Sequence, residues 1–321
     1  MLVLNESDIK KIGIDWTALV DVIEEAVLCM NDKDFAQPLK PYLRFRNPKN
    51  RIIAMPAFLG GNFNKAGIKW IASFPGNIQN GIPRAHSVVI LNDADTGEPL
   101  AVINTALLSI IRTASVSGLV IKHFKKTREL ANIRIGITGM GPIGYNHLKM
   151  CMGLLGDRIS KISVYDIRPV NPALFEGDDR VEIVSDWTKA YEDADIFITC
   201  TVSDAAYIDQ QPKPGSLHLN VSLRDYKTTV YPWFKDAMLV DDWTEVCREK
   251  TDIEHMHLQC GLTEADTRSV IDIVKNDVLA CFKPNQPVMF NPMGMAIFDI
   301  AIATHYYNLG ITTGAGTLVD N

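Results

Sequence analysis

The first third of the chain combines one amphipathic helical region with a series of short apolar runs. Over residues 7–31, Trp16, Leu19, Ile23 and Val27 recur at helical spacing, so we expect a helix that buries one face. The runs that follow are rich in β-branched residues and are separated by turn residues, which favours an antiparallel sheet. Extended segments are predicted at Gln37–Arg46, Arg51–Pro56, Ala66–Phe74, Ser87–Asn92 and Leu100–Asn104, followed by a helix over Thr105–Lys126.

From Asn132 to Asp241 the pattern changes to short buried strands that alternate with helices, which predicts a doubly wound parallel sheet. A last apolar run, Asn291–Asn308, predicts a long helix, and the residues from Gly310 onward are expected to be loose. The strands and helices predicted in the second block are Ile133–Thr138, Tyr145–Leu155, Ile162–Asp166, Trp187–Ala194, Ile196–Thr201, Ser216–Ser222 and Ala237–Asp241.

A terminal helix this apolar must pack on another element, and packing on the first block would make that block discontinuous. We therefore expect an α/β fold with a Rossmann-like doubly wound domain at residues 119–294. The second domain would be α+β and would consist of residues 1–118 and 295–321.

Three glycines between the first two strands of the second block have the spacing G-x-G-x-x-G. Gly139 permits a tight turn, Gly141 lets a pyrophosphate approach the backbone, and Gly144 lets the helix pack close to the strand. The helix N-terminus adds free N–H groups and a positive dipole end. Asp166 lies 166 − 144 = 22 residues further on, where an acid accepts hydrogen bonds from the adenosine ribose. We expect NAD as the cofactor, although Arg168 could accept the 2′-phosphate of NADP.

Composition and charge argue against several classes of protein. A net charge of −6, without a basic cluster, argues against nucleic-acid binding. The N-terminus has no basic segment before a long apolar run, and no apolar stretch suggests a membrane span. The six cysteines form no C-x-x-C pair, and His255-x-His257 matches no metal-binding spacing. We expect a cytoplasmic protein with reduced thiols and no metal.

Four motifs occur in the order and spacing of one protein family: Lys69 in Gly-Ile-Lys-Trp, Arg112 in Ile-Arg-Thr-Ala, the Gly139 fingerprint and the segment around Gly294. On these motifs the sequence resembles the ornithine cyclodeaminase/μ-crystallin family over nearly the whole chain. Longer strings resemble the branch that makes L-2,3-diaminopropionate for siderophores and peptide antibiotics. These strings are Gln37–Arg44, Arg51–Pro56, Ser73–Asn77, Pro83–Ala85, Val240–Thr244 and Asn291–Ile297.

The resemblance implies a homodimer whose substrate-binding and dimerisation domain is interrupted by the Rossmann domain. It also implies that hydride leaves a C–N carbon for NAD and that water attacks the resulting imine, which yields 2-oxoglutarate and diaminopropionate. Such hydrolysis needs a base for the water and an acid for the leaving amine. Asp225 follows a predicted parallel strand and aligns with the family's catalytic aspartate, so we expect it to be the acid/base. Lys69 is expected to share a proton near the imine.

A substrate with several carboxylates needs fixed cations, and arginine binds carboxylates in a bidentate geometry. Lys69 lies in an apolar strand, where a lysine rarely lacks a partner. By family position, Arg44 and Lys69 bind substrate carboxylates, and Arg112 lies near the cofactor phosphates or the substrate. Arg46 competes with Arg44, because strand alternation would put both on one face. The candidate substrate ligands are Arg44, Met55, Lys69, Arg84 and Arg112. The candidate cofactor ligands are Arg112, Thr113, Gly139, Met140, Gly141, Pro142, Ile143, Gly144, Asp166, Arg168, Cys200, Thr201, Val202, Ser203, Ser222, Lys227 and Gly294.

Two positions depart from the family pattern. Ornithine cyclodeaminase has an acidic residue where this chain has Met55, which counts against ornithine as the substrate. The resembled branch usually has Glu where this chain has Phe298, which changes specificity if the side chain touches substrate and is simply core if the helix is packed. Two alternatives stay open: a cyclodeaminase or imine reductase, and a μ-crystallin-like protein that binds a dinucleotide and a small ligand without turnover.

Overall fold

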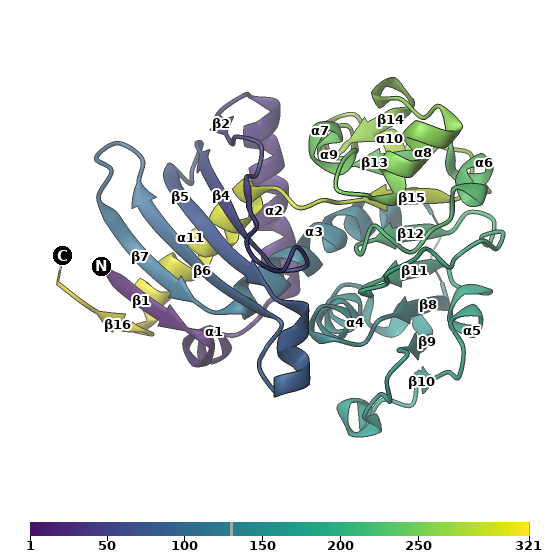
Figure 1. The fold of residues 1–321 in the computed structure, drawn as a ribbon, viewed down its shortest axis with the longest axis horizontal. Helices are drawn as coiled ribbons and strands as arrows, with labels where there is room; N and C mark the ends of the chain where they lie inside the picture. Colours follow the sequence, from purple (N-terminus) through teal and green to yellow (C-terminus); the bar gives the residue numbers. More distant parts are fainter. Residues whose placement is uncertain (129–130, 321) are drawn as a thin grey trace. The chain divides into compact units, whose positions relative to one another are not determined.

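The computed structural model describes residues 1–128 and 131–320. Its internal contacts divide the chain into two compact units (Figure 1). One unit is Met1–Ser115 together with the segment that starts at Gly294, and the other is Val116–Met293. The boundaries expected from the sequence, after residues 118 and 294, lie close to these divisions. Residues 129, 130 and 321 of the expected ranges lie outside the described part.

Among its described residues, the first unit has one eight-stranded sheet in the order β16-β1-β7-β6-β5-β4-β2, with β3 also paired to β4. Strands β4 to β7 are antiparallel neighbours, as the short apolar runs predicted. β1 adds a parallel pair at β7. The strands are β1 (Leu2–Asn5), β2 (Phe35–Ala36), β3 (Tyr42–Leu43), β4 (Arg51–Leu59), β5 (Lys65–Ser73), β6 (Ala85–Asp93), β7 (Pro99–Asn104) and β16 (Thr317–Leu318), with a short η1 (Pro75–Asn80) between β5 and β6.

The central helix of this unit is α11 (Ala296–Thr313), drawn in yellow in Figure 1. It packs against β4, β5, β6 and α2 (Trp16–Asn31), and it also contacts α1 (Glu6–Ile12). Every residue from Ala296 to Thr304 is buried, which is typical of a helix that is apolar on all sides. Phe298 is therefore a core residue of this unit.

The prediction that the chain is loose from Gly310 onward was wrong. α11 continues to Thr313 and ends at Gly314, which has a left-handed conformation. β16 then pairs antiparallel with β1, and the Val319 N–H donates to the Met1 carbonyl at 2.9 Å. The pairing partner is the opposite end of the chain, so the local sequence pattern of the tail carries no sign of it.

The two faces of this sheet have different surroundings. Lys69 in β5 lies opposite Met55 in β4 and Val89 in β6, and all three are buried on the face that packs against α11. Successive side chains of a strand point to opposite faces, so Trp70 points the other way. Trp70 is 42% exposed and Ile90 is 37% exposed. The outer face thus presents apolar side chains to solvent.

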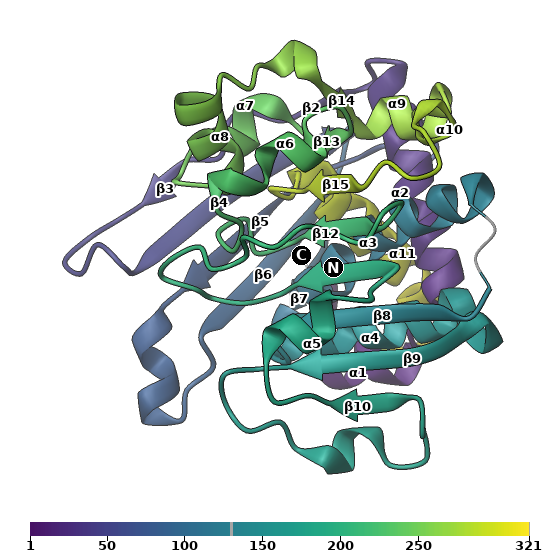
Figure 2. The ribbon, with the colours of Figure 1, turned by 90° about the vertical axis from the view of Figure 1, so that its right-hand side faces the viewer.

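The second unit is built on a parallel sheet with the order β10-β9-β8-β11-β12-β15-β13-β14. The chain order reverses between β8 and β11, so the sheet is doubly wound and the predicted Rossmann-like fold is confirmed (Figure 2). Its strands are β8 (Ile133–Thr138), β9 (Ile159–Tyr165), β10 (Val181–Ile183), β11 (Ile196–Thr199), β12 (Leu217–Asn220), β13 (Met238–Val240), β14 (Thr267–Ser269) and β15 (Val288–Asn291). Its helical segments are α4 (Pro142–Leu155), η2 (Gly156–Arg158), η3 (Pro172–Phe175), α5 (Trp187–Tyr191), η4 (Thr228–Val230), α6 (Tyr231–Phe234), α7 (Trp243–Val246), α8 (Asp252–Cys260), η5 (Glu264–Asp266), α9 (Val270–Lys275) and α10 (Val278–Cys281).

The hydrophobic pattern did not predict one central strand, and it predicted that the last helix begins earlier than it does. β15 is buried and lies between β12 and β13, so Asn291 ends a strand and does not begin a helix. The last helix begins only at Ala296. Both segments are apolar, and a short apolar run cannot be assigned to strand or helix by periodicity alone.

Helix α3 (Ala106–Thr127) has the length and hydropathy of a membrane span, contrary to the expectation that no segment would. Most of this helix is buried in the structure, which is also what a core helix of a globular protein shows. No other described helix has both properties.

Candidate functional site

The glycine turn has the shape that its spacing predicted. Gly139 adopts a φ of 87°, and a Cβ atom there would lie 2.5 Å from the carbonyl carbon of Cys200. A Cβ atom on Gly144 would lie 1.9 Å from the Gly139 carbonyl oxygen, so only glycine lets α4 begin this close to β8. In contrast, a Cβ atom on Gly141 would meet nothing within 4 Å. The space beside Gly141 is therefore free of protein atoms, as the approach of a pyrophosphate requires.

The N-terminus of α4 adds a favourable environment for an anion. The helix begins at Pro142 with Gly141 as its N-cap, and no side chain accepts from its first N–H groups. The N–H groups of Ile143 and Gly144 therefore lie at the positive end of the helix dipole. Pro142 lacks an N–H and favours the first helical position.

Asp166 follows β9 and fastens the glycine turn. Its Oδ2 accepts from the Met140 N–H at 2.8 Å, and its Oδ1 accepts from the Arg168 N–H at 2.9 Å. The Arg168 Nε lies 3.4 Å from the same Oδ1, and the Arg168 side chain is largely exposed. A carboxylate accepts more than two hydrogen bonds, so Asp166 keeps capacity for a ribose hydroxyl.

Asp225 is fully buried in the loop that follows β12. The Thr201 hydroxyl donates to its Oδ1 at 2.5 Å, and the Ser222 hydroxyl donates to its Oδ2. Burial raises the pKa of the Asp225 carboxyl, while these hydroxyls and that of Thr199 act in the opposite direction. A raised pKa makes a carboxyl a better proton acceptor, which suits general acid/base catalysis.

Asp252, at the start of α8, supports Asp225 from the protein interior. Its Oδ2 accepts from the N–H groups of Asp225 and Tyr226, both at 3.1 Å, and from Asn220 Nδ2 at 3.0 Å. Burial raises the pKa of Asp252 to about 7. Asp252 was not predicted from the sequence, because an acid in the first turn of a helix is also common at surfaces.

The first unit has its own buried polar cluster, around Lys69 on β5. The Lys69 Nζ lies 2.8 Å from Asp299 Oδ2 and 3.2 Å from Ser109 Oγ. The Arg112 Nε lies 3.0 Å from Asp299 Oδ1. Lys69 is 1% exposed, Arg112 7% and Asp299 0%. One carboxylate therefore bridges two buried cations, and the predicted ligands Lys69 and Arg112 come together.

The surroundings of Lys69 lower its pKa to about 7. Burial is the largest cause, and the positive charge of Arg112 adds to it. The Asp299 carboxylate acts in the opposite direction, both by its charge and by its hydrogen bond. Asp299 was not predicted from the sequence, although its position offered a signal: it is the only acid in the apolar helix α11, where a carboxylate needs a partner.

Gly294 and Met55 also belong to this cluster. A Cβ atom on Gly294 would lie 2.6 Å from Arg112 Nη1, and the Gly294 carbonyl accepts from Lys40 Nζ at 2.6 Å. The requirement for glycine here thus has a packing reason within the first unit, and its contact with the cofactor stays a prediction. Met55 is buried and lies directly opposite Lys69.

The remaining candidate cations of the first unit lie outside this cluster. Arg44 is exposed, with its guanidinium carbon 5.2 Å from the centre of the Tyr42 ring. β3 ends at Leu43 and Arg46 has a φ of 54°, so the expectation that Arg44 and Arg46 share a strand face was wrong. Arg84 is partly buried just before β6. Their roles as substrate ligands stay predictions.

Several expected cofactor ligands already have partners within their own segments. The Thr113 hydroxyl donates to the Ser109 carbonyl at 2.8 Å inside α3, and the Ser203 hydroxyl donates to the Ala205 carbonyl. The Lys227 Nζ lies 2.6 Å from Asp209 Oδ2 at the surface. After β11, Val202 is 64% exposed, whereas burial raises the pKa of the Cys200 thiol well above its usual value.

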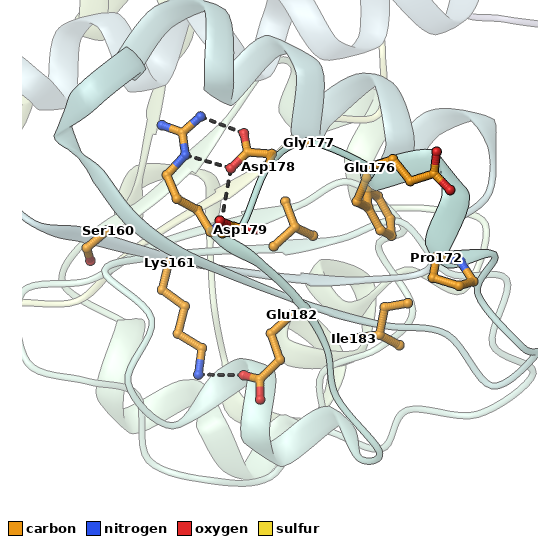
Figure 3. A pocket seen from close by; sticks show the side chains of 12 residues that line it. Ser160, Lys161, Pro172, Glu176, Gly177, Asp178, Asp179, Glu182 and Ile183 are labelled. Carbon is orange, nitrogen blue, oxygen red and sulfur yellow. Dashed lines mark hydrogen bonds and ion pairs between the residues drawn. The ribbon is translucent and has the colours of Figure 1, made fainter.

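A separate hollow of about 740 Å³ lies at the outer edge of the second unit's sheet, beside β9 and β10 (Figure 3). Four of its charged side chains form two ion pairs: Arg180 with Asp178, and Lys161 with Glu182. Lys161 lies near the start of β9, whereas the glycine turn bonds to Tyr165 at the end of that strand. The hollow is therefore not the predicted dinucleotide site.

Within the described residues, no group of three His, Cys, Asp or Glu side chains is placed to hold a metal.

Comparison with known proteins adds an independent observation. The sequence profile of the Ornithine cyclodeaminase/mu-crystallin family matches residues 2–310. The chain belongs to this family. N-((2S)-2-amino-2-carboxyethyl)-L-glutamate dehydrogenase from Staphylococcus aureus is 35% identical over 338 aligned positions, which cover 100% of this chain and 98% of that relative.

Two solved structures show the same fold. The Delta(1)-pyrroline-2-carboxylate reductase of Thermococcus litoralis, in complex with NADH and L-proline, matches with a TM-score of 0.89 and 24% identity, covering 99% of this chain and 100% of that one. An archaeal alanine dehydrogenase dimer with bound NAD matches with a TM-score of 0.84 and 22% identity, covering 100% of this chain and 99% of that one. Membership of the ornithine cyclodeaminase/mu-crystallin family confirms the resemblance drawn from Lys69, Arg112 and the glycine motifs.

Proposed function

We propose that this chain is an NAD-dependent oxidoreductase that cleaves N-(2-amino-2-carboxyethyl)-L-glutamate to L-2,3-diaminopropionate and 2-oxoglutarate. One observation carries the choice of substrate: the 35% identity to the Staphylococcus aureus dehydrogenase named for this compound extends over the whole chain. The diaminopropionate would supply siderophore or peptide antibiotic biosynthesis.

The residues of the second unit fit a bound dinucleotide. The open space beside Gly141 and the uncapped start of α4 suit a pyrophosphate, and the carboxylate of Asp166 suits a ribose diol. The same carboxylate would repel a 2′-phosphate, which favours NAD over NADP. When bound, NAD accepts a hydride from the carbon attached to the secondary amine.

Asp225 is the proposed acid/base for the hydrolysis that follows. The water oxygen forms a bond to the imine carbon as Asp225 accepts a proton from the water. The C–N bond then breaks, and the proton leaves with the amine of diaminopropionate. Substrate, NAD⁺ and water thus give diaminopropionate, 2-oxoglutarate, NADH and H⁺. The raised pKa of Asp225 supports this role, because the group must carry the proton between two steps.

Lys69 and Arg112 are the proposed ligands of a substrate carboxylate, with Arg44 and Arg84 as further candidates. Two buried cations share the single carboxylate of Asp299, so this carboxylate does not neutralise both of them when Lys69 is protonated. Buried charge favours an opposite charge nearby, and the proposed substrate has several carboxylates. Met55 places no carboxylate opposite Lys69. An amino group binds well beside a carboxylate, so this position does not suit the second amino group of ornithine.

The test is the appearance of NADH absorbance when the purified protein is given NAD and N-(2-amino-2-carboxyethyl)-L-glutamate, with L-ornithine in parallel. NADH formed together with 2-oxoglutarate and diaminopropionate supports the proposal. Proline formed from ornithine without net NADH would identify a cyclodeaminase. No reaction with either compound, despite NAD binding, would favour another imine substrate or a non-catalytic binding protein.

We also propose that the protein is a homodimer that buries the outer face of the first unit's sheet. Two cross-strand pairs on this face are apolar: Trp70 lies opposite Val88, and Ile68 lies opposite Ile90. Large exposed apolar patches on soluble proteins usually mark interaction surfaces. The archaeal alanine dehydrogenase, a structural relative, is described as a dimer.

A further inference from the structure

Asp299 joins two elements that are distant in the sequence. It lies on α11, its Oδ2 contacts Lys69 on β5 and its Oδ1 contacts Arg112 on α3. The sequence separations are 230 and 187 residues. Each carboxylate oxygen has its own cation, so rotation of the Asp299 side chain would break both contacts. The carboxylate thereby sets the distance between the ammonium and guanidinium groups.

We propose that Asp299 is a positioning residue for substrate binding: it holds Lys69 and Arg112 beside one another, so that together they bind one carboxylate of the substrate. This inference rests on the proposed function. Asp299 acts through the two cations and need not touch the substrate itself.

The geometry leaves donors for such a ligand. Asp299 uses the Nε of Arg112, which leaves both Nη atoms of the guanidinium for an anion. The Lys69 ammonium has three N–H groups, of which one points to Asp299 and one to Ser109. A guanidinium held at Nε still offers its Nη pair as a donor edge. An ammonium and a guanidinium together can therefore bind a single carboxylate.

Burial makes the charge of Lys69 depend on Asp299. The charged and polar groups that face Lys69 are Asp299 from α11, Arg112 and Ser109 from α3, and Lys40 from the segment before β3. Of these, only Asp299 is negative, and it raises the pKa of Lys69 against the effects of burial, Arg112 and Lys40. Without the carboxylate charge, the pKa of Lys69 would be lower still.

The first variant is Asp299→Asn, which keeps the size and one acceptor oxygen but removes the charge. We expect kcat/KM at pH 7.5 to fall on the order of 100-fold, mainly through KM, as displaced binding groups commonly produce. Wild-type kcat/KM should decrease above a pH of about 7, where Lys69 loses its proton, and this decrease should move to lower pH in the variant. Asp236→Asn, at an exposed carboxylate outside the site, is the matched control.

A second readout does not depend on turnover. With 13C-labelled lysine, the Cε signal of Lys69, assigned by its loss in Lys69→Met, should titrate near pH 7 in the wild type and at lower pH in Asp299→Asn. An unchanged midpoint overturns the proposal, as does an unchanged kcat/KM profile. If the wild type does not oxidise the proposed substrate, the proposed function fails, while this titration still tests Asp299.

Asp299→Glu keeps the test available if the Asn variant does not fold. It retains the charge but displaces the carboxylate by one methylene group in a packed site. We expect Lys69 to titrate close to its wild-type midpoint, while kcat/KM still falls because the two cations are moved. Wild-type kcat/KM in Asp299→Glu would overturn the positioning role.

Discussion

Met55 and Lys69 are direct partners in the antiparallel pair of β4 and β5. Residues opposite one another in such a pair have Cβ atoms about 5 Å apart and share one face of the sheet. The side chain at position 55 therefore contributes to the surroundings of the Lys69 ammonium. Met55 is buried and uncharged, so it adds no charge beside the Lys69 ammonium. The negative charge that the ammonium contacts is that of Asp299.

Met55→Glu should weaken binding of a substrate that carries several carboxylates. A buried carboxylate opposite Lys69 would pair with the ammonium and compete with the substrate, so kcat/KM should fall about tenfold or more. Steady-state kinetics checks this, with Met55→Leu as the control because it nearly conserves volume and lacks charge. Unchanged kinetics in Met55→Glu would show that Lys69 does not bind the substrate.

Asp225→Asn should abolish most turnover and leave cofactor binding intact. Loss of a general acid/base reduces rates by about 10²- to 10⁴-fold. The amide of Asn can still accept a hydrogen bond from one of the hydroxyls of Thr201 and Ser222 and can donate to the other. Turnover and the dissociation constant for NADH are measured in parallel, with Asp157→Asn at an exposed position as the control. Full activity in Asp225→Asn would remove the proposed acid/base and favour a binding protein.

Two alanine substitutions in the glycine turn should affect different properties, one the binding of NADH and the other the stability of the protein. Gly141→Ala adds a methyl group where no protein atom lies within 4 Å, so the stability should change by less than about 1 kcal/mol while NADH binding weakens. Gly144→Ala places the methyl group 1.9 Å from the Gly139 carbonyl oxygen, so the protein itself should be destabilised. Thermal unfolding and NADH titration separate the two effects. Equal NADH affinity in Gly141→Ala and the wild type would contradict a pyrophosphate at this position.

Asp252 should make the free energy of unfolding decrease as the pH rises from about 4 to about 7. The pKa of its carboxyl is raised from 3.8 to about 7 by burial, so in this range the folded protein binds a proton that the unfolded chain has lost. The stabilisation is complete below the unfolded pKa and is lost as the pH rises through the folded one. Asp252→Asn stays neutral, so its stability relative to the wild type should increase by up to about 1.4 kcal/mol per pH unit.

This pH dependence is measured as a difference, because two buried histidines act in the opposite direction. The pKa of His147 is lowered to about 4 and that of His218 to about 3, so the stability they contribute is lost as the pH falls below 6.5. Urea unfolding of the wild type and Asp252→Asn at several pH values between 4 and 8 cancels their contribution. Parallel curves for the two proteins would show that Asp252 is ionised throughout.

Trp70→Glu should weaken the proposed dimer. A carboxylate in the centre of an apolar interface commonly raises the free energy of association by about 2 kcal/mol or more. The molar mass in solution, measured by light scattering over a range of concentrations, should then approach that of the monomer. Leu258→Glu is the control, because Leu258 is an exposed apolar residue of the second unit. A wild type that is monomeric throughout would contradict the proposal.

The features that the sequence predicted well depend on neighbouring residues. The glycine turn, the strand before it and the acid 22 residues later are one βαβ unit, whose geometry follows from local sterics and strand periodicity. The alternating runs of the first unit likewise predicted β4 to β7, because a strand with one buried face shows its period in the sequence. The motifs that carry the family resemblance are also short stretches of neighbouring residues.

The features that the sequence did not predict depend on distant partners. β15 and the start of α11 are both apolar, so only their neighbours in space distinguish strand from helix. β16 exists because the N-terminal strand lies beside it. Asp252 accepts from the backbone N–H groups of Asp225 and Tyr226, which lie 27 and 26 residues away in the sequence.

The sequence by itself determined the dinucleotide fold, the family and most of the residue types that the proposed reaction needs. The tertiary structure decided which of these residues act together: Lys69 and Arg112 meet at Asp299, whereas Arg44 lies at the surface. The physical reason is that hydrophobic periodicity and turn sterics are properties of adjacent residues. The charge and position of a buried lysine instead depend on the groups that folding brings within a few ångströms of it, wherever they lie in the chain.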